Sequence, residues 1–184
     1  MDLCSTTLAH CFLPDDHTDK YDGPLPSLHE GMFCYTWFCI EYLKPIPVVS
    51  GKNEGMLQMV SGLEYLHLKD LIHRNLKPNN ILVFSTSKSV QFKLSDVGQT
   101  KNYLSVWMAP ELLDTFWDDP PSISNCMFNA ASDVWSLGCI FYYFLTKGSH
   151  PFKDCSMVET LLRIVEGRPC FSPGTYHFQL VVHC

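Results

Sequence analysis

The most constraining feature of the sequence is the run at residues 131–146, ASDVWSLGCIFYYFLT, which is apolar on nearly every side of the helix that it predicts. Such a helix must be shielded from water around its whole circumference, so other elements have to enclose it. The chain has 184 residues, which is enough for one domain with a sizeable core. We therefore expect Trp135 and the aromatic residues at 141–144 to be core residues.

Periodicity and breaker residues predict the elements around this helix. Apolar residues at helical spacing predict an amphipathic helix at 54–68. Two short runs separated by a turn predict strands at 81–84 and 90–94. A last helix is predicted at 156–166, with Ser156 in a capping box at its start.

The two ends of the chain differ from this middle part. Residues 1–31 contain LPDD and DGPLP and show little periodicity, so we expect an irregular N-terminal segment. Residues 32–43, MFCYTWFCIEYL, are aromatic and β-branched, which predicts a buried strand. We expect one domain at 32–169, followed by a C-terminal tail at 170–184.

The composition excludes several classes of protein. The formal net charge of −6 argues against nucleic acid or an anionic membrane as a partner. The sequence has no window of about 18 apolar residues and no signal peptide, so we expect no membrane segment and a cytoplasmic location. The nine cysteines are odd in number and scattered, which is typical of reduced thiols rather than a disulfide framework.

A series of short motifs occurs in a fixed order. They are HRNLKPNN at 73–80, DVG at 96–98, APE at 109–111, DVWSLG at 133–138 and HPF at 150–152. In this order they resemble the C-terminal lobe of eukaryotic protein kinases, over about residues 32–169. The strings SVWMAPELL and FLTKGSHPFKD resemble in particular the inositol-requiring kinase–endoribonucleases of the unfolded-protein response and ribonuclease L.

The resemblance implies an α+β, protein-kinase-like fold that is truncated: a mainly α-helical C-lobe with a remnant of the N-lobe sheet. It also implies ATP and Mg²⁺ as cofactors and transfer of the γ-phosphoryl group to Ser or Thr. Asp96 and Asn80 match the metal ligands, and Lys77 matches the lysine that neutralises the transferring group. From the residues alone, Asp96 and Asn80 could also be ordinary turn residues, and Lys77 a solvated lysine.

The resemblance also implies a nucleotide-binding region. Leu82 resembles the leucine that packs under adenine. The hinge, whose backbone would meet the adenine edge, is expected at Ile40, Glu41, Tyr42 and Leu43. His73 and Asp133 are expected to be structural, with the buried Asp133 carboxylate accepting hydrogen bonds from the backbone around His73 to Asn75.

The sequence departs from the kinase pattern at several positions. Asn75 stands where the family has the aspartate that accepts the substrate proton, and an amide has no useful basicity. Val97 replaces a phenylalanine, and only residues 99–108 separate Gly98 from the APE motif. The sequence contains no Gly-rich phosphate loop and no VAIK-like strand lysine, since Lys20 has a turn-like context.

These departures leave three hypotheses about function. The first is a kinase-family protein that is catalytically impaired. The second is a pseudokinase module that binds a protein partner through its helical lobe. The third is an active kinase that obtains the missing parts from another chain.

Overall fold

The computed structural model describes residues 4–21, 23, 52–85, 89–98, 104–118 and 128–171. The predicted strand at 32–43, and with it Ile40, Glu41 and Leu43, lies outside these residues. The predicted tail at 170–184 lies outside them beyond Phe171.

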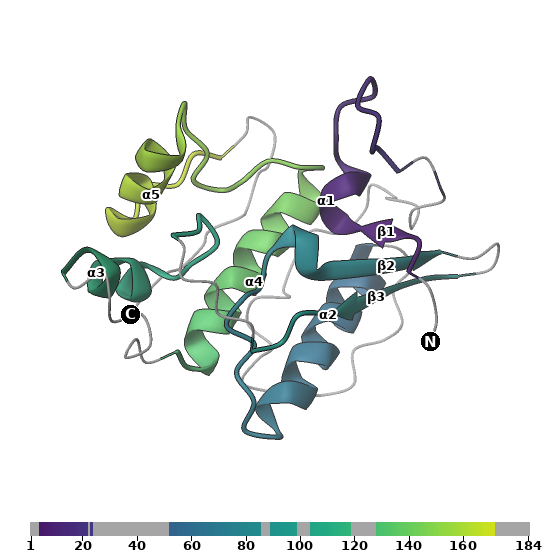
Figure 1. Ribbon diagram of the computed structural model, residues 1–184, viewed down its shortest axis with the longest axis horizontal. Helices are drawn as coiled ribbons and strands as arrows, with labels where there is room; N and C mark the ends of the chain where they lie inside the picture. Colours follow the sequence, from purple (N-terminus) through teal and green to yellow (C-terminus); the bar gives the residue numbers. More distant parts are fainter. Residues whose placement is uncertain are drawn as a thin grey trace.

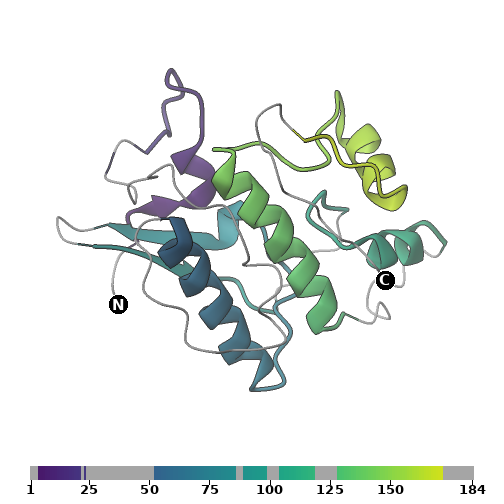
Figure 2. The same ribbon diagram turned by 180° about the vertical axis from the view of Figure 1, so that it is seen from behind.

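The elements follow one another in the order expected of a mostly helical domain. Their bounds are β1 Thr6–Thr7, α1 Leu8–Cys11, α2 Lys52–His67, the 3₁₀ turn η1 Pro78–Asn80, β2 Ile81–Ser85, β3 Val90–Leu94, α3 Pro110–Asp118, α4 Ala130–Leu145 and α5 Met157–Val165. The helix α4 runs through the middle of the molecule, with α2 and the sheet on one side and α3 and α5 on the other (Figure 1 and Figure 2). None of the helices in the described ranges is long and apolar enough to cross a lipid bilayer.

The central helix α4 confirms the prediction of a helix enclosed on all sides. Tyr142 and Phe144 are fully buried, and Trp135 stacks on Phe152 with ring centroids 5.7 Å apart. The helix begins at a capping box that the sequence analysis did not identify. The Asn129 side chain accepts from the Ser132 N–H at 3.0 Å, and the Ser132 hydroxyl accepts from the Asn129 N–H at 3.3 Å.

The sheet and α2 form the larger core with α4. Strands β2 and β3 pair antiparallel, as predicted, with Val83 opposite Phe92. Met59 of α2 and these two side chains are buried in this core. Gly55 of α2 is needed here because a Cβ atom at this position would lie 2.9 Å from the Phe92 ring. The core residues of this cluster are Leu8, Cys11, Met56, Met59, Leu63, Leu76, Ile81, Val83, Phe92, Leu137, Ile140 and Phe144.

The N-terminal segment, predicted to be irregular over residues 1–31, contributes two short elements to the fold within its described residues. Thr6–Thr7 pair antiparallel with β2. Leu8 and Cys11 of the following turn are buried in the main core. A strand of two residues shows no periodicity, and its partner lies far along the chain, so local sequence patterns could not predict this pairing.

The second core lies between α4 and the pair α3 and α5. Leu113, Cys139, Phe152, Leu161 and Ile164 are its buried members. The sequence analysis did not predict α3, although Pro110 is its first residue and proline is favoured at that position.

The predicted last helix is confirmed as α5, and of the predicted capping box the bond from the Glu159 N–H to the Ser156 side chain is present, while the Glu159 carboxylate bonds the Ser156 hydroxyl. The Ser156 side chain accepts from the Glu159 N–H at 3.2 Å, and the Glu159 carboxylate accepts from the Ser156 hydroxyl at 2.8 Å. At the other end Gly167 has φ 61°, a left-handed conformation that glycine adopts at little cost.

Candidate active site

The loop that follows α2 is held by a buried carboxylate on α4. Asp133 is 2% exposed. Its Oδ2 accepts from the His73 N–H at 2.7 Å, and its Oδ1 accepts from the Arg74 N–H at 2.9 Å. His67 Nε2 lies 2.9 Å from the same Oδ2. The predicted role of Asp133 is therefore confirmed, because this carboxylate fixes the backbone at the start of residues 73–80.

His73 is fully buried beneath this loop. Burial lowers its pKa, while the nearby Asp133 charge acts in the opposite direction. Its Nδ1 accepts from the Asn75 N–H at 3.4 Å, and its carbonyl accepts from the Gly98 N–H at 3.0 Å. The second bond joins the loop at 73–80 to the loop at 96–98.

A chain of hydrogen bonds joins the two loops that carry the candidate metal ligands. Asn80 is buried, and its Nδ2 donates to the Asn75 carbonyl at 2.7 Å. The Asn80 carbonyl accepts from the Ser95 N–H at 3.0 Å and from the Ser95 hydroxyl at 3.2 Å. Asp96, the next residue, therefore lies beside Asn80 although the two are far apart in the sequence.

The groups that would face a ligand are more accessible than the groups that hold the loops. Asp96 is exposed and has φ 58°, a conformation that aspartate tolerates better than most residues. Lys77 and Asn75 are half-buried, and Val97 is 39% exposed. The absence of a phenylalanine ring at 97 thus leaves only a small apolar side chain near the surface.

Leu82 lies on the face of β2 that points away from the core. Its neighbours Ile81 and Val83 are fully buried, and successive side chains in a strand point to opposite faces. Leu82 itself is half-buried, with Thr7 opposite it on one neighbouring strand and Lys93 on the other.

The segment beside Leu82 is one that the sequence analysis did not identify. The Ser5 N–H donates to the Val83 carbonyl at 2.9 Å, and Thr7 is the register partner of Leu82. The predicted hinge at 40–43 lies outside the described residues, so its position beside Leu82 stays a prediction. The two adjacent β-branched threonines were the only local signal for the observed strand.

The segment before the APE motif is anchored to α4 and to the loop after it. The Ser136 hydroxyl donates to the Trp107 carbonyl at 2.7 Å. The Trp107 ring meets the His150 ring edge-on at a centroid distance of 4.6 Å. Burial lowers the pKa of His150 to about 4, so this imidazole is neutral at physiological pH. Glu111 of the motif is exposed.

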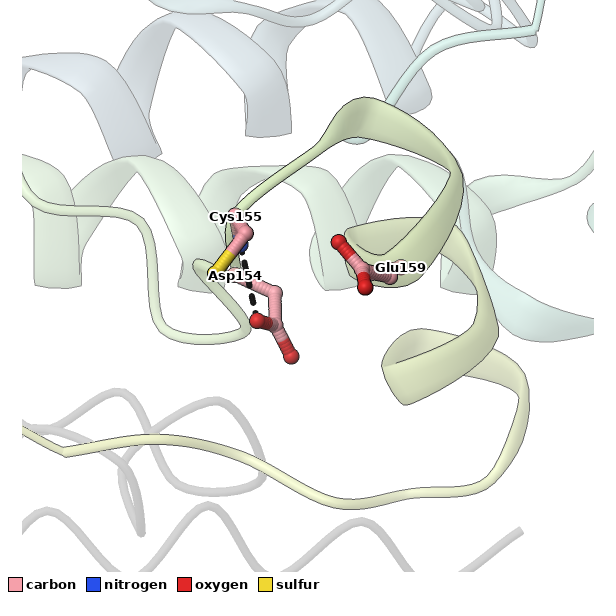
Figure 3. Close-up of side chains that lie close together, drawn as sticks. All are labelled: Asp154, Cys155 and Glu159. Carbon is pink, nitrogen blue, oxygen red and sulfur yellow. Dashed lines mark hydrogen bonds between the residues drawn. The ribbon is translucent and has the colours of Figure 1, made fainter.

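A second group of possible metal ligands lies away from this site, at the start of α5. Ligand atoms of Asp154, Cys155 and Glu159 all lie within 4.8 Å of one another (Figure 3). The Asp154 carboxylate is already paired with Arg163 and accepts from the Cys155 N–H at 2.7 Å. Hydrogen bonding to Asp154 raises the pKa of the Cys155 thiol, which disfavours the thiolate that a metal would need. This group is therefore explained by the structure of the helix start.

The fold and the loop geometry together define an α+β domain with a kinase-type catalytic loop. The protein kinase domain model matches residues 49–171. The chain belongs to the protein kinase domain family, and the predicted protein-kinase-like fold with its mainly helical lobe is confirmed.

Among its relatives is the human serine/threonine-protein kinase/endoribonuclease IRE2, which is 35% identical over 143 residues. This match covers 68% of the chain and 14% of the human protein. The ire-1 protein of Caenorhabditis elegans is 37% identical over 106 residues, covering 53% of the chain and 11% of that protein. The predicted resemblance to this group is confirmed, and the chain spans only a small part of the length of these relatives.

A solved structure supports the same fold. The crystal structure of the Rad53 kinase domain and SCD2 in complex with AMPPNP superposes with a TM-score of 0.51 and 28% sequence identity. The match covers 66% of this chain and 43% of the Rad53 chain.

Proposed function

We propose that this chain is a catalytically impaired kinase-type lobe that binds Mg²⁺–ATP weakly and transfers little or no phosphate to Ser or Thr. One observation carries the proposal: the start of the loop at 73–80 is held by Asp133, yet the residue at the proton-acceptor position is Asn75. An amide cannot take the substrate proton, and a general base typically contributes about 10²–10⁴-fold to the rate.

The residues that would hold the cofactor fit it chemically. The Asp96 carboxylate and the Asn80 side-chain oxygen are the kind of ligand that Mg²⁺ prefers. The Asn80 amide nitrogen is used by the Asn75 carbonyl, so only the oxygen end of this side chain is available to a cation. When bound, Mg²⁺ would neutralise phosphate charge, and Lys77 would add a second positive charge. The Rad53 neighbour was crystallised with the ATP analogue AMPPNP, which supports a nucleotide site in this fold.

Binding is expected to be weak, in the high-micromolar range or worse. Phosphates in kinases are held from two sides, and the sequence contains no Gly-rich loop or strand lysine for the second side. As the second candidate, a pseudokinase module in the cytoplasm would keep the anchored loops and use the helical lobe to bind a protein. Its connection with the unfolded-protein response rests on the resemblance of the strings SVWMAPELL and FLTKGSHPFKD to the inositol-requiring kinase–endoribonucleases.

Calorimetry with ATP and Mg²⁺ tests the proposal. We expect weak, metal-dependent heat for the wild type and none for Asp96→Asn, which removes the charged ligand. Asp114→Asn, at an exposed position on α3, is the matched control and should bind like the wild type. A sub-micromolar dissociation constant, or turnover of a generic Ser/Thr substrate with radiolabelled ATP, would contradict the proposal.

A further inference from the structure

Helix α5, at the edge of the molecule (Figure 1), carries large apolar side chains on its solvent side, where a surface helix normally carries polar ones. Val158 is 61% exposed, Leu162 45% and Val165 37%. Their spacing of four and three residues places them on one side of the helix, with the two ends about 10 Å apart. Several such side chains on one face indicate an interaction surface. We call Val158, Leu162 and Val165 the α5 stripe.

The charged residues of α5 and of the turn after it already have partners within the chain. The Glu159 carboxylate accepts from the Ser156 hydroxyl at 2.8 Å. The two arginines of this region are in ion pairs, Arg163 with Asp154 and Arg168 with Glu166. A charged partner would have to compete with these pairs, so we expect the segment that covers the α5 stripe to be apolar and uncharged.

The chain turns back beside α5 after the helix ends. Gly167 has φ 61°, and the Arg168 N–H donates to the Arg163 carbonyl at 2.9 Å. The Cys170 N–H then donates to the carbonyl of Pro151 at 2.7 Å, and Pro151 belongs to the loop that leads into α5. The segment after the helix therefore returns alongside it (Figure 2).

Phe171 is the last described residue, and it marks where the rest of the chain begins. Its ring lies 5.7 Å from the Tyr142 ring, measured between centroids, and the side chain is 37% exposed. Residues 172–184 follow directly, outside the described residues, and we call them the tail segment. From Phe171 to Tyr176 the chain can extend by up to about 17 Å, which is more than the roughly 13 Å length of α5.

The sequence of the tail segment, SPGTYHFQLVVHC, matches the surface of α5. It contains no Asp, Glu, Lys or Arg. Apolar residues alternate with other residues at Tyr176, Phe178, Leu180 and Val182, and this spacing puts them on one side of an extended chain. Three of them in succession span roughly 13 Å, close to the length of the α5 stripe.

We propose that the tail segment docks on the α5 stripe of the same chain and covers it. Phe178 and Leu180, in the middle of the alternating run, supply the main apolar contacts. The two segments are neighbours in the sequence, so little loop-closure entropy opposes the contact. With the stripe covered, this side of the helical lobe is closed to a partner protein.

Photo-cross-linking of the full 184-residue chain tests this proposal. Phe178 is replaced by the photoreactive analogue p-benzoylphenylalanine, the sample is illuminated, and the products are separated by size and mapped by mass spectrometry. We expect cross-links within one chain, to residues 157–168. Leu162→Glu should lower their yield about 10-fold or more, because the central apolar contact of the stripe is lost. Leu180→Glu in the tail segment should have a similar effect.

The matched control is Leu57→Glu on α2, which makes the same chemical change at a leucine that is 51% exposed and should leave the yield unchanged. Cross-links that join two chains, cross-links to α2 or to the sheet, or no cross-links would each overturn the proposal. An undiminished yield in Leu162→Glu, or an equal loss in Leu57→Glu, would overturn it as well. Circular dichroism of each variant checks that these substitutions at exposed positions leave the fold intact.

Discussion

The base and the rim of the candidate active site differ in how firmly their residues are held. At the base, Asp133 and His150 are buried polar residues that fix the loop at 73–80 and the segment before the APE motif. At the rim, Asp96 is exposed and Asn75 is half-buried. The residues at the base of the site keep their hydrogen bonds, while the rim carries an amide, Asn75, where the kinase pattern has an aspartate. The two parts of the site are therefore held by different numbers of interactions.

Removing the carboxylate at the base should have the largest effect. Asp133→Ala leaves the His73 and Arg74 N–H groups without their acceptor in a buried place, and each such loss costs about 1–3 kcal/mol. We expect a loss of about 3–5 kcal/mol in the free energy of unfolding, measured by urea denaturation. Asp114→Ala, an exposed aspartate on α3, is the control and should change stability by less than about 0.5 kcal/mol. A loss below about 1 kcal/mol for Asp133→Ala would mean that the base is not held by this carboxylate.

Lowering the pH should have the next largest effect, because it reduces the stability that the buried His150 contributes at the base of the site. Burial lowers the pKa of His150 from 6.5 to about 4, so the unfolded chain binds a proton more readily between these values. The stability from keeping this imidazole neutral is complete above about pH 6.5 and is lost as the pH falls to about 4. At about 1.4 kcal/mol per unit, the loss amounts to about 3 kcal/mol. His73, whose pKa burial also lowers, acts in the same direction.

His150→Asn separates this effect from the titration of carboxylates. In the wild type, His150 Nδ1 accepts a hydrogen bond from the Phe152 N–H at 3.1 Å. The asparagine side-chain oxygen can still accept this bond, but the amide is not protonated between pH 4 and pH 8. The difference in unfolding free energy between pH 7.5 and pH 4.5 should shrink by about 2–3 kcal/mol relative to the wild type. An unchanged pH dependence would show that His150 is solvated.

A smaller loss of stability is expected from changing Asn80, which lies between the base and the rim of the site. Asn80→Ala removes the bond to the Asn75 carbonyl and should cost about 1 kcal/mol. Asn80→Asp should cost more, because it places an acceptor against that carbonyl. Asn79→Ala, at the exposed neighbouring position, is the control for both. Equal urea midpoints for Asn79→Ala and Asn80→Asp would contradict the assigned hydrogen bond.

The sequence predicted those elements whose stability is visible in local patterns. The enclosed helix α4 was predicted because apolar residues cover its whole circumference, and α5 because Ser156 and Gly167 mark its ends. The strands β2 and β3 were predicted because two short apolar or alternating runs flank a turn. The register between them could not be predicted, since it depends on which side chains fit against α2.

The missed helix α3 had a local signal in Pro110, whereas the missed strand β1 depends on distant contacts. The strand Thr6–Thr7 forms by pairing with the edge of β2. Leu8 is buried, but the residues around it show no helical or alternating pattern of apolar side chains that would predict this. In the site, the order of the motifs predicted that Asp133 would hold the loop. It could not predict the chain of bonds from Asn75 through Asn80 to Ser95, because that chain requires the loop and the hairpin to be placed in three dimensions.

The smallest effect is expected at the rim itself, from restoring the proton acceptor. Asn75→Asp changes a half-buried side chain and should leave stability within about 0.5 kcal/mol. It should not restore phosphoryl transfer. A general base multiplies the rate of a complex that is already positioned, nominally by about 10²–10⁴-fold. Positioning can contribute roughly 7–11 kcal/mol, and the sequence contains neither a Gly-rich loop nor a strand lysine to supply it.

The measurement is a radiolabelled-phosphate transfer assay on the wild type and Asn75→Asp, with Mg²⁺ and a generic Ser/Thr substrate. Asn75→Ala is the control, because it lacks both the amide and the acid. If Asn75→Asp alone gave robust turnover, the missing general base would be the main defect of the site. The loss of activity would then be due to a single side chain at the rim. The groups that position the phosphates would have to be present within the 184 residues of this chain.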